Sequence, residues 1–185
     1  MELSGPTMRR WTAELGQLGA DARGFGRTLG RRSSTPNHLF VIGTPDWEPW
    51  HFVAHLGEEA TRHGRTDLVP GLLRWKVPPG APPHLALSAD DMAHASPRHT
   101  FLVLAPVGDA PGLFERISDA KKLGARIMSV HRGDETLLGL SHETLSVNPS
   151  RGERAFEITQ HVVTDSAPAP PPERSPWWAR PKRVH

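Results

Sequence analysis

Short apolar segments recur along the middle of the chain, and each is about as long as a β-strand. HTFLVLA (99–105) is the most apolar of them, and HLFVIG (38–43) is similar. Nearly continuous apolar runs of this length are typical of parallel strands that are buried on both faces. We expect strands in these two segments and in three weaker ones, LLRWKV (72–77), ARIMSV (125–130) and TLSVN (144–148).

The segments between the strands have the spacing of amphipathic helices. Helices are expected at 50–64, 88–95, 112–124, 136–141 and 153–163. Asp46 is a candidate N-cap for the first, and Ser88 with Asp91 has capping-box spacing at the second. Strands that alternate with helices predict a single α/β domain with a parallel sheet.

The two ends of the chain differ from this central part. Residues 4–30 have apolar positions at helical spacing, including Trp11, Leu15 and Leu18, although several glycines weaken the pattern. We therefore expect an N-terminal helix and linker over 1–37 and the α/β domain over 38–165. The remaining stretch, 166–185, is rich in proline, which predicts a disordered tail.

Charge is divided unevenly along the 185 residues. Residues 38–165 hold 12 Lys+Arg against 16 Asp+Glu, whereas each end has a net charge of +3. An acidic central domain makes nucleic-acid binding by that domain an unfavourable hypothesis. The chain has no cysteine, which excludes disulfides and thiolate chemistry, and its apolar runs are too short to cross a bilayer. We expect a cytoplasmic protein.

The stretch FLVLAPVGDAPGLFERISDAKKLGARIMSVHRGDETLLGLSHETLSV (101–147) resembles the sugar isomerase (SIS) domain. Its centre, DAKKLGARIMSV, matches a helix end and strand of that family, and ETLLGLSHETLSV matches the following short helix and strand. The resemblance implies a flavodoxin-like, five-stranded parallel sheet flanked by helices. It also implies a phosphosugar site between the first and third strands, and a homodimer.

The loop after the third strand departs from the family pattern. SIS domains typically have Ser-x-Ser-Gly-x-Thr here, and the matching residues, Ala105 to Ala110 with Gly108 as the shared glycine, include no hydroxyl. Pro106 removes an amide donor, and Asp109 repels an anion at the helix start. The Gly-x-Gly-x-Ser loop expected after the first strand is also absent. These departures predict a degenerate phosphosugar site.

The loop GTPDWEPW (43–50) follows the first strand and is expected to face the 105–110 loop. Its acids, hydroxyl and two indoles suit a small polar ligand, either a phosphosugar or another compound. The candidate ligand-binding residues are Thr44, Asp46, Trp47, Glu48, Trp50, Gly108, Asp109 and Arg132. The alternative is that Asp46 only caps a helix, the tryptophans only pack, and Arg132 is only a solvated charge.

His51, His55 and Glu58 lie at helical spacing, one turn apart. Two imidazoles and a carboxylate on one face match the ligands of zinc, although the HExxH arrangement is absent. The same residues are candidates for the acid or base of an aldose–ketose isomerase. Neither role is selected by the sequence, so we assign no catalytic residue, no metal and no cofactor.

The tail pairs Trp177 and Trp178 with basic residues between prolines. Such a segment can dock to a protein partner, stack on single-stranded nucleic acid or lie at a membrane surface. The alternative is a solvated terminus that binds nothing. Taken together, the sequence favours a non-catalytic SIS-like binding module with a regulatory or scaffolding role. A phosphosugar isomerase and a nucleic-acid-associated protein are the alternatives.

Overall fold

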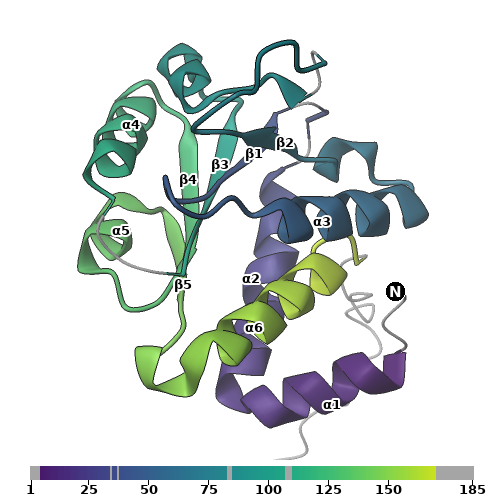
Figure 1. The fold of residues 1–185 in the computed structure, drawn as a ribbon. Helices are drawn as coiled ribbons and strands as arrows, with labels where there is room; N and C mark the ends of the chain where they lie inside the picture. The colour runs from purple at the N-terminus through teal and green to yellow at the C-terminus, as the bar shows by residue number, and fades with distance from the viewer. Residues whose placement is uncertain (1–4, 34, 37, 83–84, 107–109, 170–185) are drawn as a thin grey trace, which may run out of the picture.

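The computed structural model describes residues 5–33, 35–36, 38–82, 85–106 and 110–169. Its centre is a five-stranded sheet in the order β2-β1-β3-β4-β5, in which every neighbouring pair is parallel (Figure 1). The strands are β1 (Leu39–Ile42), β2 (Gly71–Leu73), β3 (Thr100–Ala105), β4 (Arg126–His131) and β5 (Glu143–Ser146). The predicted α/β fold with a five-stranded parallel sheet is confirmed.

Helices cover both faces of the sheet (Figure 1). One face packs against α2 (Gln17–Arg32), α3 (Trp50–Arg62) and α6 (Gly152–Ser166), and the other against α4 (Pro111–Lys122), α5 (Glu135–Leu140) and the 3-10 helix η3 (Ala89–His94). All six residues of β3 are buried, because this central strand faces a hydrophobic cluster on each side. This explains its continuously apolar sequence.

The N-terminal segment is two helices, so the expectation of one helix over 4–30 is wrong. The chain turns at Gly16 between α1 (Gly5–Leu15) and α2, where the backbone takes a φ of 60°. This left-handed conformation interrupts the helical ladder and suits glycine, which has no Cβ. The amphipathic pattern continues across the turn because both helices contribute to the same hydrophobic cluster.

Two glycines of α2, Gly26 and Gly30, lie where that helix packs against α6. A Cβ added to Gly26 would be 2.6 Å from the Val163 carbonyl oxygen, and one added to Gly30 would overlap the carbonyl of Ala167. Glycine at these positions lets the two helix backbones approach closely. Gly26, one of the glycines that weaken the helix pattern in the sequence, therefore has a packing role in the fold.

Of the two helix caps predicted from the sequence, one is present in the structure and the other is not. The Ser88 hydroxyl accepts a hydrogen bond from the Asp90 amide, and the Asp91 carboxylate accepts one from the Ser88 amide. These two hydrogen bonds form the predicted capping box. At α3 the N-cap position is Pro49, and no side chain caps it. The expectation that Asp46 caps this helix is wrong, because the loop reaches the helix three residues later.

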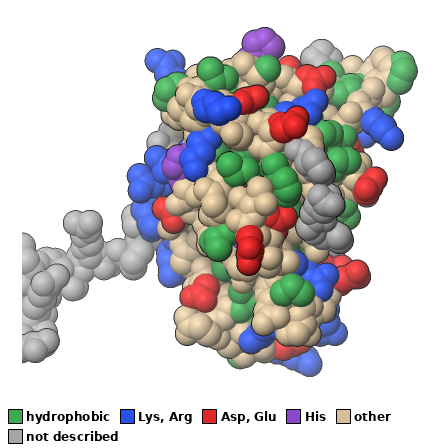
Figure 2. Space-filling view, turned by 90° about the vertical axis from the view of Figure 1, so that its left-hand side faces the viewer, with side chains coloured by type: hydrophobic (Ala, Val, Ile, Leu, Met, Phe, Trp, Pro, Cys, Tyr) green, Lys and Arg blue, Asp and Glu red, His purple; other side chains and the backbone are tan. Residues whose placement is uncertain are grey.

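Two further observations concern the surface. Among the described residues, no helix combines the length and hydropathy needed to span a bilayer. On the side formed by α4 and α5, Lys and Arg alternate with Asp and Glu rather than gathering by sign (Figure 2). The tail tryptophans, Trp177 and Trp178, lie outside the described residues.

Candidate functional site

The carboxyl ends of β1 and β3 lie side by side, with Ile42 paired in register to Val103. The sheet order reverses direction between these strands, since β2 lies beyond β1 and β4 lies beyond β3. Open α/β sheets bind ligands at such a switch point. The loop that follows β1 is described in full, whereas Gly108 and Asp109 of the loop after β3 lie outside the described residues.

The first half of the β1 loop is held against the protein. Thr44 is buried and forms a bridge with Trp47, whose amide donates to the Thr44 carbonyl at 3.1 Å. The Trp47 indole meets the Phe156 ring of α6 edge-on, with 6.2 Å between centroids. Thr44 and Trp47 therefore shape the loop, and Asp46 is exposed between them.

The second half of the loop joins a cation and an aromatic ring. The Glu48 carboxylate accepts the Trp50 indole N–H at 2.8 Å and the Arg74 Nε at 3.2 Å. The Arg74 guanidinium also lies over the Trp50 ring, 4.8 Å from its centroid. Trp50 nevertheless remains 41% exposed, so one large aromatic surface is available beside the strand ends.

Trp75 spans the switch point, and sequence reasoning missed it. Its indole N–H donates to the carbonyl of Gly43 at the end of β1, at 3.0 Å. A Cβ added to Gly112, in the first turn of α4, would be 4.0 Å from the Trp75 ring. Arg116 of α4 lies over the same ring, 5.2 Å from its centroid, and pairs with Asp90 at 2.6 Å.

The indole of Trp75 thus lies between the end of β1 and the start of α4, where SIS domains are expected to hold a phosphate. The segment Arg74–Trp75 was expected to continue the second strand. β2 instead ends at Leu73, and the two residues that follow turn toward the switch point. No spacing signal distinguishes a residue that continues a strand from one that leaves it, which is why the sequence did not identify them.

The end of β4 carries a buried polar network. The Asp134 amide donates to Nδ1 of His131, so this nitrogen carries no proton, and Nε2 donates to the Thr144 hydroxyl at 2.8 Å. Burial lowers the pKa of His131, against the opposing charge of Asp134. Ser129 binds Thr144 and Ser141 through its hydroxyl. Both ring nitrogens of His131 are therefore engaged in hydrogen bonds that favour the neutral imidazole.

Arg132 follows this network and contacts the backbone. Its Nη2 donates to the carbonyl of Pro149 at 2.8 Å, which ties the end of β4 to the 3-10 helix η4 (Pro149–Arg151). The prediction that Arg132 binds a ligand is not tested by this contact.

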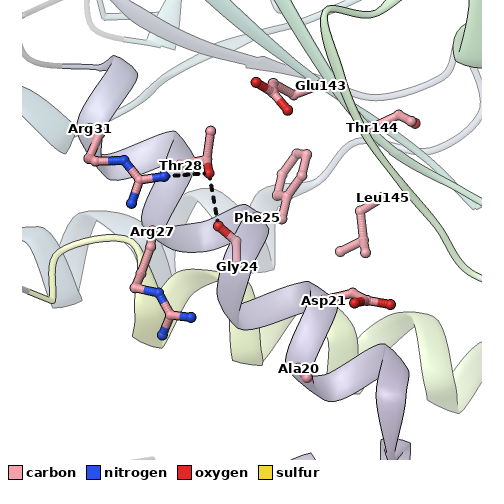
Figure 3. A pocket seen from close by; sticks show the side chains of 10 residues that line it. All are labelled: Ala20, Asp21, Gly24, Phe25, Arg27, Thr28, Arg31, Glu143, Thr144 and Leu145. Atoms are coloured by element: carbon pink, nitrogen blue, oxygen red, sulfur yellow. Dashed lines mark hydrogen bonds between the residues drawn. The ribbon is translucent and has the colours of Figure 1, made fainter. Parts of the chain in front are cut away.

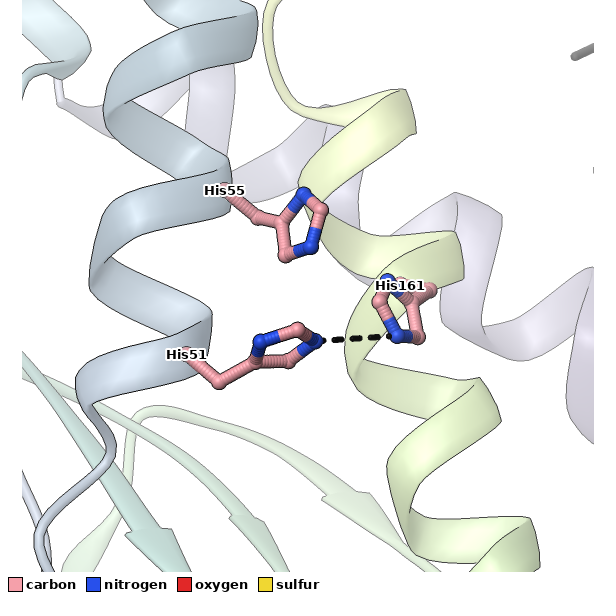
Figure 4. A group of neighbouring side chains, drawn as sticks. All are labelled: His51, His55 and His161. Atoms are coloured by element: carbon pink, nitrogen blue, oxygen red, sulfur yellow. Dashed lines mark hydrogen bonds between the residues drawn. The ribbon is translucent and has the colours of Figure 1, made fainter. Parts of the chain in front are cut away.

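The two predicted histidines of α3 meet a third from α6 (Figure 4). Nε2 of His51 and Nε2 of His161 are 3.3 Å apart, and the ring of His55 lies 4.8 Å from that of His161, centroid to centroid. The three residues present nitrogens that all lie within 4.8 Å of one another. Glu58, expected on the same face, forms an ion pair with Arg62 at 3.6 Å.

Sequence reasoning did not identify His161, because it is 106 residues from His55 and only helix packing brings them together. Burial, together with the neighbouring His55 and His51, lowers the pKa of His161 to about 4. Burial also lowers the pKa of His55. The neighbouring His51 lowers it as well, whereas the negative charge of Glu58 raises it. The neutral form is therefore favoured at His55 and His161.

An open hollow of about 550 Å³ lies elsewhere, between α2 and the edge strand β5 (Figure 3). Phe25 and Leu145 line it together with charged residues of both signs, such as Arg27 and Glu143. Thr28, which also lines it, accepts from Arg31 and donates to Gly24, so these polar groups are already paired. Its mixed charge gives no preference for an anion or a cation.

No protein-family model matches the sequence, and no curated protein is significantly similar to it. Solved structures are similar in fold. The Vibrio vulnificus NanR protein complexed with ManNAc-6P superposes with a TM-score of 0.57 at 14% identity, over 88% of this chain and 60% of that one. The sugar isomerase domain of the RpiR transcription factor from Sphaerobacter thermophilus gives a TM-score of 0.49 at 11% identity, over 78% and 77%.

This chain therefore spans less than two thirds of the NanR chain. At such low identity the similarity to NanR shows the fold alone. The shared fold agrees with the five-stranded parallel α/β architecture that the sequence resemblance to SIS domains implies.

Proposed function

We propose that the chain is a non-catalytic SIS-like binding module whose phosphosugar site is degenerate. The observation that carries this proposal is the position of Trp75, which bridges Gly43 and the first turn of α4. An indole here takes space that a phosphate needs at a helix N-terminus. The sequence of the 105–110 loop includes Asp109 and no hydroxyl side chain. Its carboxylate repels an anion, and the loop lacks the hydroxyls that would donate hydrogen bonds to one.

Two candidate acids or bases near the strand ends are already engaged, which weighs against isomerisation. Aldose–ketose exchange needs a group that takes a proton from one carbon and returns it to the next. His131 has both ring nitrogens engaged in hydrogen bonds, and Glu48 is paired with Arg74. Neither group is free to move a proton.

The ligand class follows from the side chains of the β1 loop. The exposed ring of Trp50 offers a stacking surface, and the carboxylates of Asp46 and Glu48 accept hydrogen bonds from hydroxyl or ammonium groups. Thr44 and Trp47 position this loop, and Arg132, Gly108 and Asp109 complete the predicted ligand-binding set. An uncharged sugar or an amino sugar without phosphate fits these groups better than a phosphosugar does. NanR, by contrast, was solved with a sugar phosphate.

Thermal shift of the full chain against sugars, amino sugars and sugar phosphates, including ManNAc-6P, tests this proposal. We expect stabilisation by a non-phosphorylated compound, loss of that effect in Trp50→Ala, and its retention in Trp50→Phe. Leu138→Ala, on the exposed surface of α5, is the control for general destabilisation. Stabilisation by sugar phosphates alone would show that the phosphosugar site is intact.

A second measurement tests the absence of catalysis. Aldose and ketose phosphates are incubated with the chain in D₂O, and NMR follows deuterium exchange at the carbon next to the carbonyl. We expect no exchange beyond the protein-free rate. Exchange that depends on the protein would overturn the non-catalytic assignment.

The proposal includes a cytoplasmic homodimer with a regulatory or scaffolding role, which the SIS resemblance implies. Light scattering coupled to size exclusion measures the oligomeric state, and a monomer at micromolar concentration would refute the dimer. A truncation that removes 170–185 tests whether Trp177 and Trp178 dock to a protein partner. Salt-dependent DNA or RNA binding that disappears with this truncation would favour the nucleic-acid alternative instead.

A further inference from the structure

We propose that His51, His55 and His161 bind a transition-metal ion of the zinc class, with the fourth coordination position open. These residues come from two helices, α3 and α6, that pack against each other in the main hydrophobic cluster. His51 and His55 are four residues apart, so they project from the same side of α3. Figure 4 shows all three rings turned into the space between the helices.

The distance between nitrogens supports a metal. Tetrahedral zinc binds imidazole nitrogen at about 2.0–2.1 Å, so two such ligands are about 3.3–3.4 Å apart. The Nε2 atoms of His51 and His161 are separated by 3.3 Å. Two imidazole nitrogens at this distance share either one proton or one metal ion.

The third ligand needs only a small adjustment. The ligand atoms of the three residues lie within 4.8 Å of one another, and His55 is half-buried rather than packed tightly in the core. A rotation that moves the ligand nitrogen of His55 by about 1.5 Å shortens a separation of 4.8 Å to the tetrahedral value of about 3.3–3.4 Å. The Trp11 ring packs against His161 at 5.2 Å between centroids, which limits the movement of that imidazole.

The ligand set selects the class of metal. Three neutral imidazoles suit Zn²⁺, Co²⁺, Ni²⁺ and Cu²⁺, whereas Ca²⁺ and Mg²⁺ require oxygen ligands. Neutral imidazole is the form of histidine that binds metal. Because His51 is exposed, the fourth position faces solvent and is open to water or a small anion.

The site is separate from the ligand loop described above, and metal binding does not depend on the proposed sugar ligand. His51 is nevertheless the second residue of α3, directly after the β1 loop. A bound ion would therefore add a positive charge close to that loop.

Titration of the metal-free, untagged full-length chain with Co²⁺, followed by competition with Zn²⁺, tests the proposal. We expect one equivalent of Co²⁺ to produce the intense visible absorption of tetrahedral coordination, and Zn²⁺ to displace it. His161→Ala and His55→Ala should each weaken Co²⁺ binding by at least about 10-fold, since loss of even an outer-shell partner has an effect of this size.

Two controls separate this site from general histidine binding. His94→Ala removes an exposed histidine outside the cluster and should leave the titration unchanged. His38→Ala removes one member of a histidine pair whose ring centroids are 5.2 Å apart, and it should also have no effect. Circular dichroism confirms that the variants fold, and glutamine at the same position replaces alanine in any variant that does not, for example His161→Gln.

The outcomes are distinct. Octahedral absorption with more than one weak equivalent, or equal losses in the cluster and control variants, would overturn the proposal. Isothermal titration with Zn²⁺ gives an independent stoichiometry, and a value of one together with a weaker affinity in His161→Ala supports it.

Discussion

Replacement of Gly26 by alanine tests the close packing of α2 on α6. A Cβ at this position would lie 2.6 Å from the carbonyl oxygen of Val163 and 2.9 Å from the Cβ of Ser166. Both atoms belong to the opposite helix, so relief requires the helices to move apart. Overpacking of this kind costs about 1–3 kcal/mol.

Alanine also favours the helix over glycine by about 0.8–1.0 kcal/mol, which offsets part of that cost. Gly24→Ala is the matched control, because this glycine lies on the same helix and its Cβ would meet nothing within 4 Å. The helix-propensity gain is common to both variants and cancels in their comparison. We therefore expect Gly26→Ala to be less stable than Gly24→Ala by about 1–3 kcal/mol.

Equilibrium unfolding in urea, followed by circular dichroism, measures the two free energies of unfolding. For a chain of this size a difference of 1 kcal/mol corresponds to about 2–4 °C in Tm, so thermal unfolding provides a second measurement. Equal stability of the two variants would show that α2 and α6 do not approach as closely as the structure indicates, and the argument from Gly26 would fail.

Two further predictions concern acid stability and helix capping. The folded-state pKa of His131 is lowered by burial, so the unfolded chain takes up a proton first as the pH falls below about 6.5. The free energy of unfolding should therefore decrease below that pH. Urea midpoints measured at pH 7.5 and 5.5 with EDTA present should differ less in His131→Gln than in the unmodified chain. An unchanged difference between the two pH values would contradict the assignment. Ser88→Ala removes the capping box of η3 and should cost about 0.5–2 kcal/mol in the same assay, whereas Ser88→Thr retains the hydroxyl and should cost less.

The regular elements could be predicted because their causes are local in sequence. The apolar run of β3 requires burial on both faces, and Ser88 and Asp91 lie close enough along the chain to form their capping box unaided. The N-terminal turn at Gly16 was missed because the hydrophobic spacing continues through it. Periodicity records which side of a segment is buried, but it does not record where the backbone turns.

The sequence by itself determined the strands, most of the helices, the parallel α/β class and the loss of hydroxyls from the 105–110 loop, since each depends on residue type at neighbouring positions. Only the tertiary structure decided that Trp75 bridges the switch point and that His161 joins His51 and His55. These contacts join residues that are far apart along the chain. Their distances depend on how β2 ends and how α6 packs on α3, and no local pattern of side chains encodes that packing.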